Sequence, residues 1–321
     1  MLNSTSNILD GTRVRMGACE LVFGRQIVEL RDSGGELEDL AGLRARLDED
    51  GYLYLRGFHP RGEVQAARDE VLALLDEAGC LEPGHPREAG VIGRDEAGRK
   101  VSSDLGGSNP FIYDVQNKSK TVLFKLPLLQ ARVTQYRSLV GAQRFVDFFG
   151  ALMGGAAEAR LQNSIPRAVP TGEFTGAHYD VVYFGPQNDH IYTGWMPLGD
   201  IPLELGPLAV LLGSHQFERV RATYGQMHTV RDKTEGWFST DALEMVEKFG
   251  GMWGTTNFTA GDVVLFGMRF MHGSLNNMTE RYRLSSDCRY QLVANRKAEA
   301  GAPIAPGPER SMKDAREEWG V

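Results

Sequence analysis

The sequence predicts a mainly β fold with flanking helices, in which the strands form an antiparallel double-sheet barrel or jelly roll. Short runs rich in Val, Ile, Tyr, Thr and Phe, separated by Gly, Pro and Asn turns, follow one another from about residue 159 to residue 295. Before them, apolar residues recur at helical spacing. With 321 residues, of which 42% are hydrophobic and 24% charged, the chain has an ordinary globular composition, and we expect a single domain over residues 1–321.

Residues 38–155 are expected to form a helical N-terminal support and a lid loop. Leu40, Leu43 and Leu47 recur at the spacing of a helix with one buried stripe. Further along, Gly, Pro, Asp and Ser accumulate over a long stretch, and loops of that length often cover functional sites. In chain order the pattern predicts a helix over 38–50, a strand over 52–56, a helix from Pro60 to Gly79, a long loop over 80–117 and helical structure over 119–153.

Residues 156–296 are expected to form the jelly-roll core. The strands predicted there cover 179–184, 190–196, 208–212, 263–266 and 284–293. An insertion over 216–254, which contains a helix at 241–249 and a Gly- and Trp-bearing segment at 250–254, is interpreted as a cover over the barrel mouth. The tail over 297–321 is expected to be peripheral, with Ser311 capping a short charged helix.

A metal-binding pattern lies in the β-rich part of the chain. His178 and Asp180 are two residues apart, and in a strand such residues project from the same face. His272 follows a second predicted strand, which would place it opposite them in a closed barrel. Two imidazoles and one carboxylate suit a non-haem iron(II) site with open coordination positions, so His178, Asp180 and His272 are the candidate catalytic and metal-binding residues.

A strand late in the chain carries an unusually polar face. Its alternate positions from Arg283 to Gln291 are all polar or charged, and we expect this face to line the cavity. A buried arginine needs an anion, and its planar fork matches a carboxylate in two-point contact. Arg283 is therefore the candidate anchor for an acidic co-substrate, while Arg281 has the same parity and is an alternative.

These residues belong to a longer ordered set of motifs that covers about residues 40–291. The set comprises His178-Tyr179-Asp180, Trp195-Met196-Pro197-Leu198, Gly206-Pro207-Leu208, Gly213-Ser214-His215, Ala260-Gly261-Asp262, His272-Gly273-Ser274 and Arg283. In this order and with these spacings the chain resembles the phytanoyl-CoA hydroxylase-like group of iron(II)/2-oxoglutarate-dependent dioxygenases.

The resemblance implies a double-stranded β-helix, the jelly roll of cupin-like proteins, with iron(II) held by the two histidines and Asp180. It also implies that 2-oxoglutarate is the co-substrate and that Arg283 pairs with its distal carboxylate. Ser274, Trp195 and Gln162 match positions that line the co-substrate site in such enzymes.

The reaction implied by the resemblance uses dioxygen and converts 2-oxoglutarate to succinate and CO2. The oxidant produced would hydroxylate, desaturate or cyclise a small organic substrate, which we expect to be an intermediate of specialised metabolism. Related halogenases have a small residue in place of Asp180, so the carboxylate here favours hydroxylation over halogenation.

Other interpretations of the pattern stay open at the level of sequence. The barrel could belong to a cupin-like metal-dependent isomerase or dioxygenase that does not use 2-oxoglutarate, or to a non-catalytic binding protein. His215 fits a structural role in a tight turn better than a ligand role, and Trp195 fits core packing nearly as well as co-substrate contact. Four aromatic residues in the expected lids could either contact substrate or anchor the loops, namely Phe111, Tyr113, Trp237 and Trp253.

The charge and the apolar pattern of the sequence limit the kinds of molecule that the protein is expected to bind. The net charge is -7 and there is no Lys/Arg run, which argues against nucleic-acid binding because phosphate backbones attract clustered cations. No window approaches the roughly 18 apolar residues of a membrane span. The three cysteines are far apart in the chain and lack CxxC spacing, so we expect reduced thiols. Together, these features predict a cytoplasmic protein that acts on a small-molecule substrate. They do not determine its oligomeric state.

Overall fold

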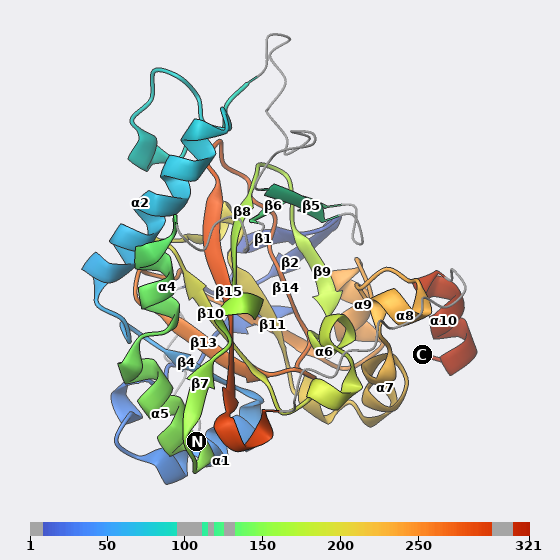
Figure 1. Ribbon diagram of the computed structural model, residues 1–321. Coiled ribbons are helices and arrows are strands. Elements are labelled where there is room, and N and C mark those ends of the chain that lie inside the picture. The colour runs from blue at the N-terminus through green and yellow to red at the C-terminus, as the bar shows by residue number, and fades with distance from the viewer. Residues whose placement is uncertain (1–8, 95–110, 115–118, 125–131, 297–310) are drawn as a thin grey trace.

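A computed structural model describes residues 9–94, 111–114, 119–124, 132–296 and 311–321 (Figure 1). Two β-sheets pack face to face and form the jelly roll that the sequence predicted. The larger sheet contains β4 (Tyr52–Leu55), β13 (Val263–Gly267), β10 (Tyr192–Pro197), β15 (Arg283–Leu292), β8 (Ile165–Val169), β6 (Ser119–Phe124) and β5 (Phe111–Asp114) in this order, and β7 (Ala157–Ala159) pairs with β15.

The smaller sheet closes the other side of the core. Its strand order is β3 (Ile27–Glu29), β12 (Met252–Thr255), β11 (Leu208–Leu212), β14 (His272–Ser274) and β9 (Thr175–His178). A separate hairpin is formed by β1 (Arg13–Met16) and β2 (Cys19–Val22). Between the sheets, Trp195 and Phe266 from the larger sheet pack in one buried cluster with Leu208 and Val210 from the smaller one.

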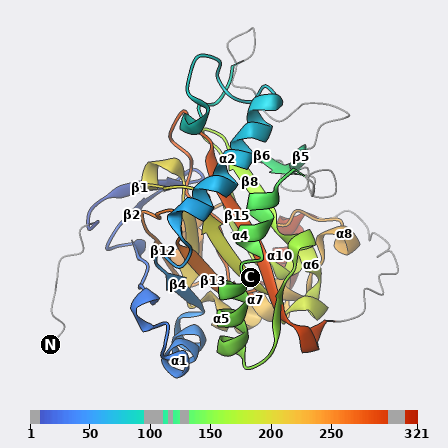
Figure 2. The ribbon, with the colours of Figure 1, turned by 60° about the vertical axis from the view of Figure 1, so that its left-hand side comes forward.

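Four of the described helices lie against the outer face of the larger sheet, and Figure 2 shows three of them, α2, α4 and α5, alongside β15. They are α1 (Leu40–Asp50), α2 (Arg61–Glu77), α4 (Thr134–Val140) and α5 (Gln143–Met153). The apolar face of α5 explains its position, because Phe145 and Phe149 are buried and contact the ring of Tyr290 on β15. The helices therefore cover one face of β15, and its other face is left for the interior of the barrel.

A second group of helices packs near β9 and the smaller sheet (Figure 1). It comprises α6 (Val181–Phe184), α7 (Glu218–Ala222), α8 (Thr229–Asp232), α9 (Ala242–Glu247) and α10 (Met312–Trp319). Ser311 caps α10 by accepting a hydrogen bond from the backbone N–H of Asp314, as the sequence indicated. Met312 and Ala315 are buried, so this helix is part of the core and is not peripheral. None of the described helices is long and apolar enough to cross a membrane.

The structure corrects three of the expected elements. Residues 119–124 form strand β6 instead of a helix, because the run of Thr, Val, Leu and Phe pairs with β5 and β8. The strand expected over 179–184 ends earlier, at His178, and 181–184 form α6. Residues 252–254, assigned to the insertion, belong to β12, where Trp253 is fully buried and pairs with Leu211 and Ile27 of the neighbouring strands.

Two further segments differ from the expectation or lie partly outside the described residues. Strands β1 to β3 were not anticipated, although their apolar residues Met16, Leu21 and Ile27 are buried. The long loop expected over 80–117 falls mostly on residues that the structure does not describe, and its end forms strand β5.

Candidate metal centre and co-substrate pocket

The two histidines of the candidate metal site face each other across neighbouring strands. His178 ends β9 and His272 begins β14, and the antiparallel register pairs them directly, with their ring centroids 4.2 Å apart. Each Nδ1 hydrogen-bonds a carbonyl oxygen two residues back, Gly176 O at 2.9 Å and Phe270 O at 3.0 Å. Because a carbonyl only accepts, Nδ1 carries the proton and Nε2 is left as the ligand atom.

Asp180 completes the cluster from a turn. Its backbone has helical angles (φ -62°, ψ -30°), and Val181 N–H donates to Met268 O at 3.0 Å, which fixes the turn beside the segment that leads to His272. Oδ1 of Asp180 lies 3.7 Å from Nε2 of His178 and 3.8 Å from Nε2 of His272. The expected reason for the convergence of His178 and Asp180, strand alternation, is therefore wrong, because the chain has already left β9 at Asp180.

The protonation states of this cluster suit a divalent metal ion. Burial, with a smaller contribution from the neighbouring His272, lowers the pKa of His178 to about 3, so its imidazole is neutral at pH 7. Burial by itself raises the pKa of Asp180, but the positive charge of Arg289 does most to hold it below its ordinary value. The three ligand atoms lie within 4.8 Å of one another on buried side chains. Two neutral imidazoles and a carboxylate form the donor set of non-haem iron(II) sites.

A buried pocket adjoins the metal cluster between the two sheets. Its lining consists of Arg167, Thr175, His178, Trp195, Leu208, His272, Gly273, Ser274, Arg283 and Asp287. Arg167 forms an ion pair with Asp287, and both side chains are mostly buried. The pocket thus joins the candidate ligands His178 and His272 of the smaller sheet to the polar face of β15.

Arg283 is the buried cation of this pocket that lacks a carboxylate. It is 2% exposed, one of its terminal nitrogens donates to Ser285 Oγ, and its Nε has no hydrogen-bond partner. Burial, followed by the charge of Arg167, lowers the pKa of Arg283 to about 9. Among the described residues none forms an ion pair with Arg283, whereas the alternative, Arg281, is exposed. A buried guanidinium in this state fits an acidic ligand.

Comparison with known proteins assigns the chain to a family. The family model described as phytanoyl-CoA dioxygenase (PhyH) matches residues 47–285. The chain belongs to the phytanoyl-CoA dioxygenase family. It is 27% identical over 295 residues to a 1-deoxypentalenic acid 11-beta-hydroxylase of Streptomyces exfoliatus, covering 87% of this chain and 89% of the relative. A hydroxylase of the same description from Streptomyces arenae is 27% identical over 290 residues, with the same two coverages.

Solved structures show the same fold at low sequence identity. The epimerase SnoN in complex with Fe3+, alpha ketoglutarate and nogalamycin RO superimposes with a TM-score of 0.52 at 20% identity, covering 85% of this chain and 95% of SnoN. EctD from S. alaskensis with 2-oxoglutarate and 5-hydroxyectoine gives 0.52 at 19% identity, with 84% of each chain covered. Together with the family assignment and the His-Asp-His cluster, these findings identify an iron(II)/2-oxoglutarate-dependent dioxygenase.

The other co-substrate residues predicted for this dioxygenase lie in different places. Ser274 and Trp195 line the pocket and are each 2% exposed. Ser274 Oγ accepts a hydrogen bond from Thr175 N–H at 2.9 Å, and the Trp195 ring packs 4.8 Å from that of Phe258. Gln162 is exposed on the short 3-10 helix Leu161–Asn163 and is not among the pocket-lining residues, because the chain reaches the pocket only further along, at Arg167.

The sequence did not single out Arg167 or Thr193, and it gave no contacts for Asp287 and Arg289. Arg167 and Asp287 line the pocket, and Arg289 and Thr193 contact Asp180. The polar alternation along β15 already marked Asp287 and Arg289 as cavity-facing residues without indicating their partners. Nothing in the sequence around Arg167 or Thr193 distinguishes them from ordinary strand residues.

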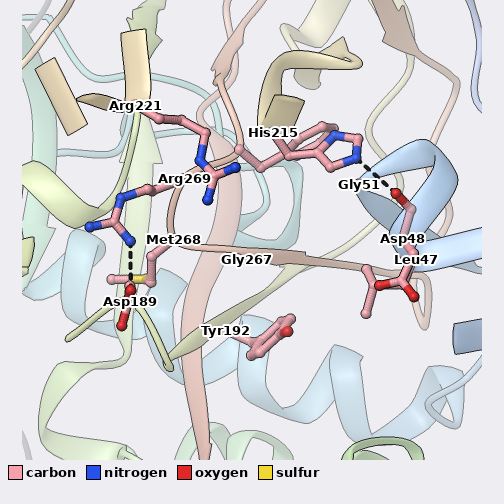
Figure 3. A pocket seen from close by; sticks show the side chains of 11 residues that line it. Leu47, Asp48, Gly51, Asp189, Tyr192, His215, Arg221, Gly267, Met268 and Arg269 are labelled. Atoms are coloured by element: carbon pink, nitrogen blue, oxygen red, sulfur yellow. Dashed lines mark hydrogen bonds and ion pairs between the residues drawn. The ribbon is translucent and has the colours of Figure 1, made fainter. Parts of the chain in front are cut away.

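His215 lies in a second pocket, outside the barrel (Figure 3). Its ring lies beside the end of α1, where Nε2 is 3.0 Å from the carbonyl oxygen of Asp48. On the other side of this pocket Arg269 pairs with Asp189 at 2.8 Å. None of the three metal-cluster residues lines this pocket, which agrees with the structural role expected for His215.

The aromatic residues of the expected lids include structural anchors. Trp253 is fully buried in the core, and its indole N–H donates to Ala242 O at 2.9 Å. Trp237 is half-buried near Gly176 on β9 and 5.7 Å from the ring of Phe174, beside the strand that carries His178. The side chains of Phe111 and Tyr113 lie outside the described part of the structure.

Proposed function

We propose that His178, Asp180 and His272 hold the iron(II) of this dioxygenase and that Arg283 binds the distal carboxylate of 2-oxoglutarate. The observation that carries the proposal is the juxtaposition of a buried His-Asp-His donor set and a buried arginine that forms no ion pair with any carboxylate of the described residues. A structural hydrogen-bonded cluster would be expected to pair its own charges. Here one cation in the same pocket remains available for a ligand.

The substrate we propose is a small organic molecule of specialised metabolism, and the reaction we propose is its hydroxylation. Support comes from relatives described as hydroxylases of 1-deoxypentalenic acid and from the carboxylate at Asp180, which occupies a coordination position that a halide would need. When bound, iron and 2-oxoglutarate supply the oxidising power: dioxygen and 2-oxoglutarate are converted to succinate and CO2 while one oxygen atom enters a C–H bond of the substrate.

The residues of the chain itself orient and shield the reactants. Arg283 fixes one end of the co-substrate by a two-point contact and so points its other end toward the metal cluster. Trp195 and Leu208 form an apolar wall of the same pocket, and the Ser274 hydroxyl can donate to a ligand while its oxygen still accepts from Thr175. Burial of every ligand side chain keeps bulk water away from the reacting centre.

The first test of this proposal is succinate release under air by protein that has been freed of metal and then reloaded. We expect succinate formation to require both iron(II) and 2-oxoglutarate, and a library of 1-deoxypentalenic acid and other small organic acids to contain compounds that stimulate it. Asp180→Ala should abolish turnover, and Arg281→Met, which removes an exposed arginine two residues before β15, should leave it unchanged. Turnover by Asp180→Ala at the wild-type rate would refute the proposed ligand set.

The cellular site proposed for the enzyme is the cytoplasm. Its three cysteines, Cys19, Cys80 and Cys288, are all unpaired, and two of them are buried. Burial raises the pKa of Cys80 to about 11 and that of Cys288 to about 12, so both are unreactive thiols. Unpaired thiols of this kind are typical of proteins in reducing compartments.

A further inference from the structure

The two carboxylate oxygens of Asp180 have different surroundings. Oδ1 is the oxygen nearest to both histidine Nε2 atoms, at 3.7 and 3.8 Å. Oδ2 accepts a hydrogen bond from Thr193 Oγ1 at 2.6 Å and lies 3.1 Å from a terminal nitrogen of Arg289. Two donors from two strands of the larger sheet, β10 and β15, therefore hold the oxygen that the histidines do not face.

The side chain of Arg289 makes few contacts other than the one with Asp180. It is 4% exposed, and among the described residues Asp180 is the carboxylate with which it forms an ion pair. Its guanidinium lies over the Phe184 ring at 5.3 Å, one nitrogen makes a long contact of 3.4 Å with Cys288 O, and Nε has no hydrogen-bond partner. Burying an arginine is costly unless its charge is matched, so its position is determined by Asp180.

Thr193 is likewise buried and directed at Oδ2 of Asp180. It is 1% exposed and lies on β10, where it pairs in register with Arg289 on β15. Its hydroxyl reaches the same oxygen that Arg289 contacts, at a distance typical of a strong O–H···O⁻ hydrogen bond. The register of two adjacent strands thus brings both donors to one atom.

We propose that Arg289 and Thr193 are positioning residues that keep Asp180 bound to the metal through Oδ1 alone. This inference rests on the proposed metal site. Three protein ligand atoms leave about three of six octahedral positions open. If Oδ2 were free, it could also bind the ion and occupy a position that the co-substrate or dioxygen requires.

The test uses Mn(II), whose bound waters relax the proton signal of bulk water, on full-length protein freed of metal. Arg289→Met should bind Mn(II) with an affinity within about fivefold of the wild type, because all three ligands remain and a nearby positive charge is lost. Its relaxation enhancement per bound ion should fall by about a third, because one of roughly three open positions is taken by Oδ2. Binding of the inert 2-oxoglutarate analogue N-oxalylglycine should weaken about tenfold, which corresponds to about 1.4 kcal/mol.

Three further variants separate this role from a general structural one. Thr193→Val, which keeps the shape of the side chain, should show the same changes to a smaller extent, and Arg289→Lys, which keeps the charge, should restore the wild-type enhancement. Arg316→Met removes another mostly buried arginine that is paired with a carboxylate, Glu244, and should alter stability without changing the enhancement. The Arg316→Met variant is therefore a control for the loss of a buried ion pair away from Asp180.

The outcomes distinguish this inference from the proposed function. Unchanged enhancement and unchanged N-oxalylglycine affinity in folded Arg289→Met and Thr193→Val would overturn the inference and leave the metal site intact. Mn(II) affinity lowered more than about fivefold in both variants would also overturn it, because these residues would then serve only to shape the ligand. Should Asp180→Ala bind Mn(II) as tightly as the wild type, the proposed metal site itself would be wrong.

Discussion

At the scale of single residues, charge neutralisation explains the pocket. Arg289 is matched by Asp180 and Arg167 by Asp287, so Arg283 is the guanidinium left for a ligand. A buried cation without a carboxylate partner is destabilising, and a dicarboxylate that binds it removes that cost. The buried guanidinium of Arg283 is therefore expected to make the pocket selective for an acidic co-substrate.

Replacement of Arg283 tests this selectivity. Arg283→Met removes a charge-assisted two-point contact, which is worth about 2–4 kcal/mol, so the Kd for 2-oxoglutarate should rise roughly 30-fold or more. Metal affinity should stay near that of the wild type, since Arg283 is not a ligand. Calorimetric titration of the metal-loaded protein measures the effect, with Arg281→Met as the matched control; equal losses in the two variants would rule out a specific role for Arg283.

A buried histidine outside the site makes stability depend on pH. His59 is 2% exposed, its Nδ1 pairs with Arg144 at 3.0 Å, and its Nε2 has no partner. Burial, and then the charge of Arg144, lowers the pKa of His59 to about 4 from its usual 6.5. Because the unfolded state binds the proton more tightly, this histidine leaves stability unaffected above pH 6.5 and destabilises the fold as the pH falls toward 4.

The pH dependence of the free energy of unfolding should differ between the wild type and His59→Gln. Between pH 7 and pH 4.5 the wild type should lose roughly 2 kcal/mol more of its free energy of unfolding than His59→Gln, which keeps an acceptor for Arg144 and does not titrate. Urea denaturation of metal-free protein at both pH values gives the two losses. Parallel losses in the two proteins would show that His59 is not the responsible group.

At the scale of elements, the proposed metal site depends on the pairing of β9 with β14. The register places His178 opposite His272, and the strands approach so closely that a Cβ built on Gly273 would lie 2.5 Å from Thr175 O. A side chain at Gly273 must therefore push β14 away from β9. Since each strand carries one histidine, strand separation and ligand separation are coupled.

Gly273→Ala tests this coupling. The variant should lose about 1–3 kcal/mol of stability from overpacking and, in addition, roughly tenfold or more in metal affinity. Gly62→Ala on α2, where a Cβ would meet nothing within 4 Å, is the matched control and should change neither quantity adversely. Chemical denaturation and metal titration give the two values, and full metal affinity in Gly273→Ala would contradict the coupling.

At the scale of the whole molecule, the sequence was sufficient to predict the jelly roll and to select three side chains that converge, because strand periodicity and ligand chemistry are local properties. It was insufficient where tertiary contacts decide the structure. Residues 252–255 became a core strand because β3, far away in sequence, pairs with them. The contact between Arg289 and Asp180 depends on a turn after His178 that strand periodicity does not predict.

The C-terminal helix α10 illustrates such a long-range contribution. Met312 is 5% exposed and packs in the hydrophobic cluster of the smaller sheet. Met312→Ala should reduce the free energy of unfolding by about 2 kcal/mol or more. Lys313→Ala, at a position whose side chain is 83% exposed, should change it by less than about 0.5 kcal/mol. Equal effects of the two substitutions in urea denaturation would show that α10 does not contribute to the core.

The most direct test of the whole account is a crystal structure of the enzyme with iron(II) and N-oxalylglycine, prepared without oxygen and measured at the iron absorption edge. We predict one anomalous peak within bonding distance of Nε2 of His178, Nε2 of His272 and Oδ1 of Asp180, and the distal carboxylate of the analogue on Arg283. Iron bound elsewhere, or an analogue whose carboxylates do not contact Arg283, would contradict the account.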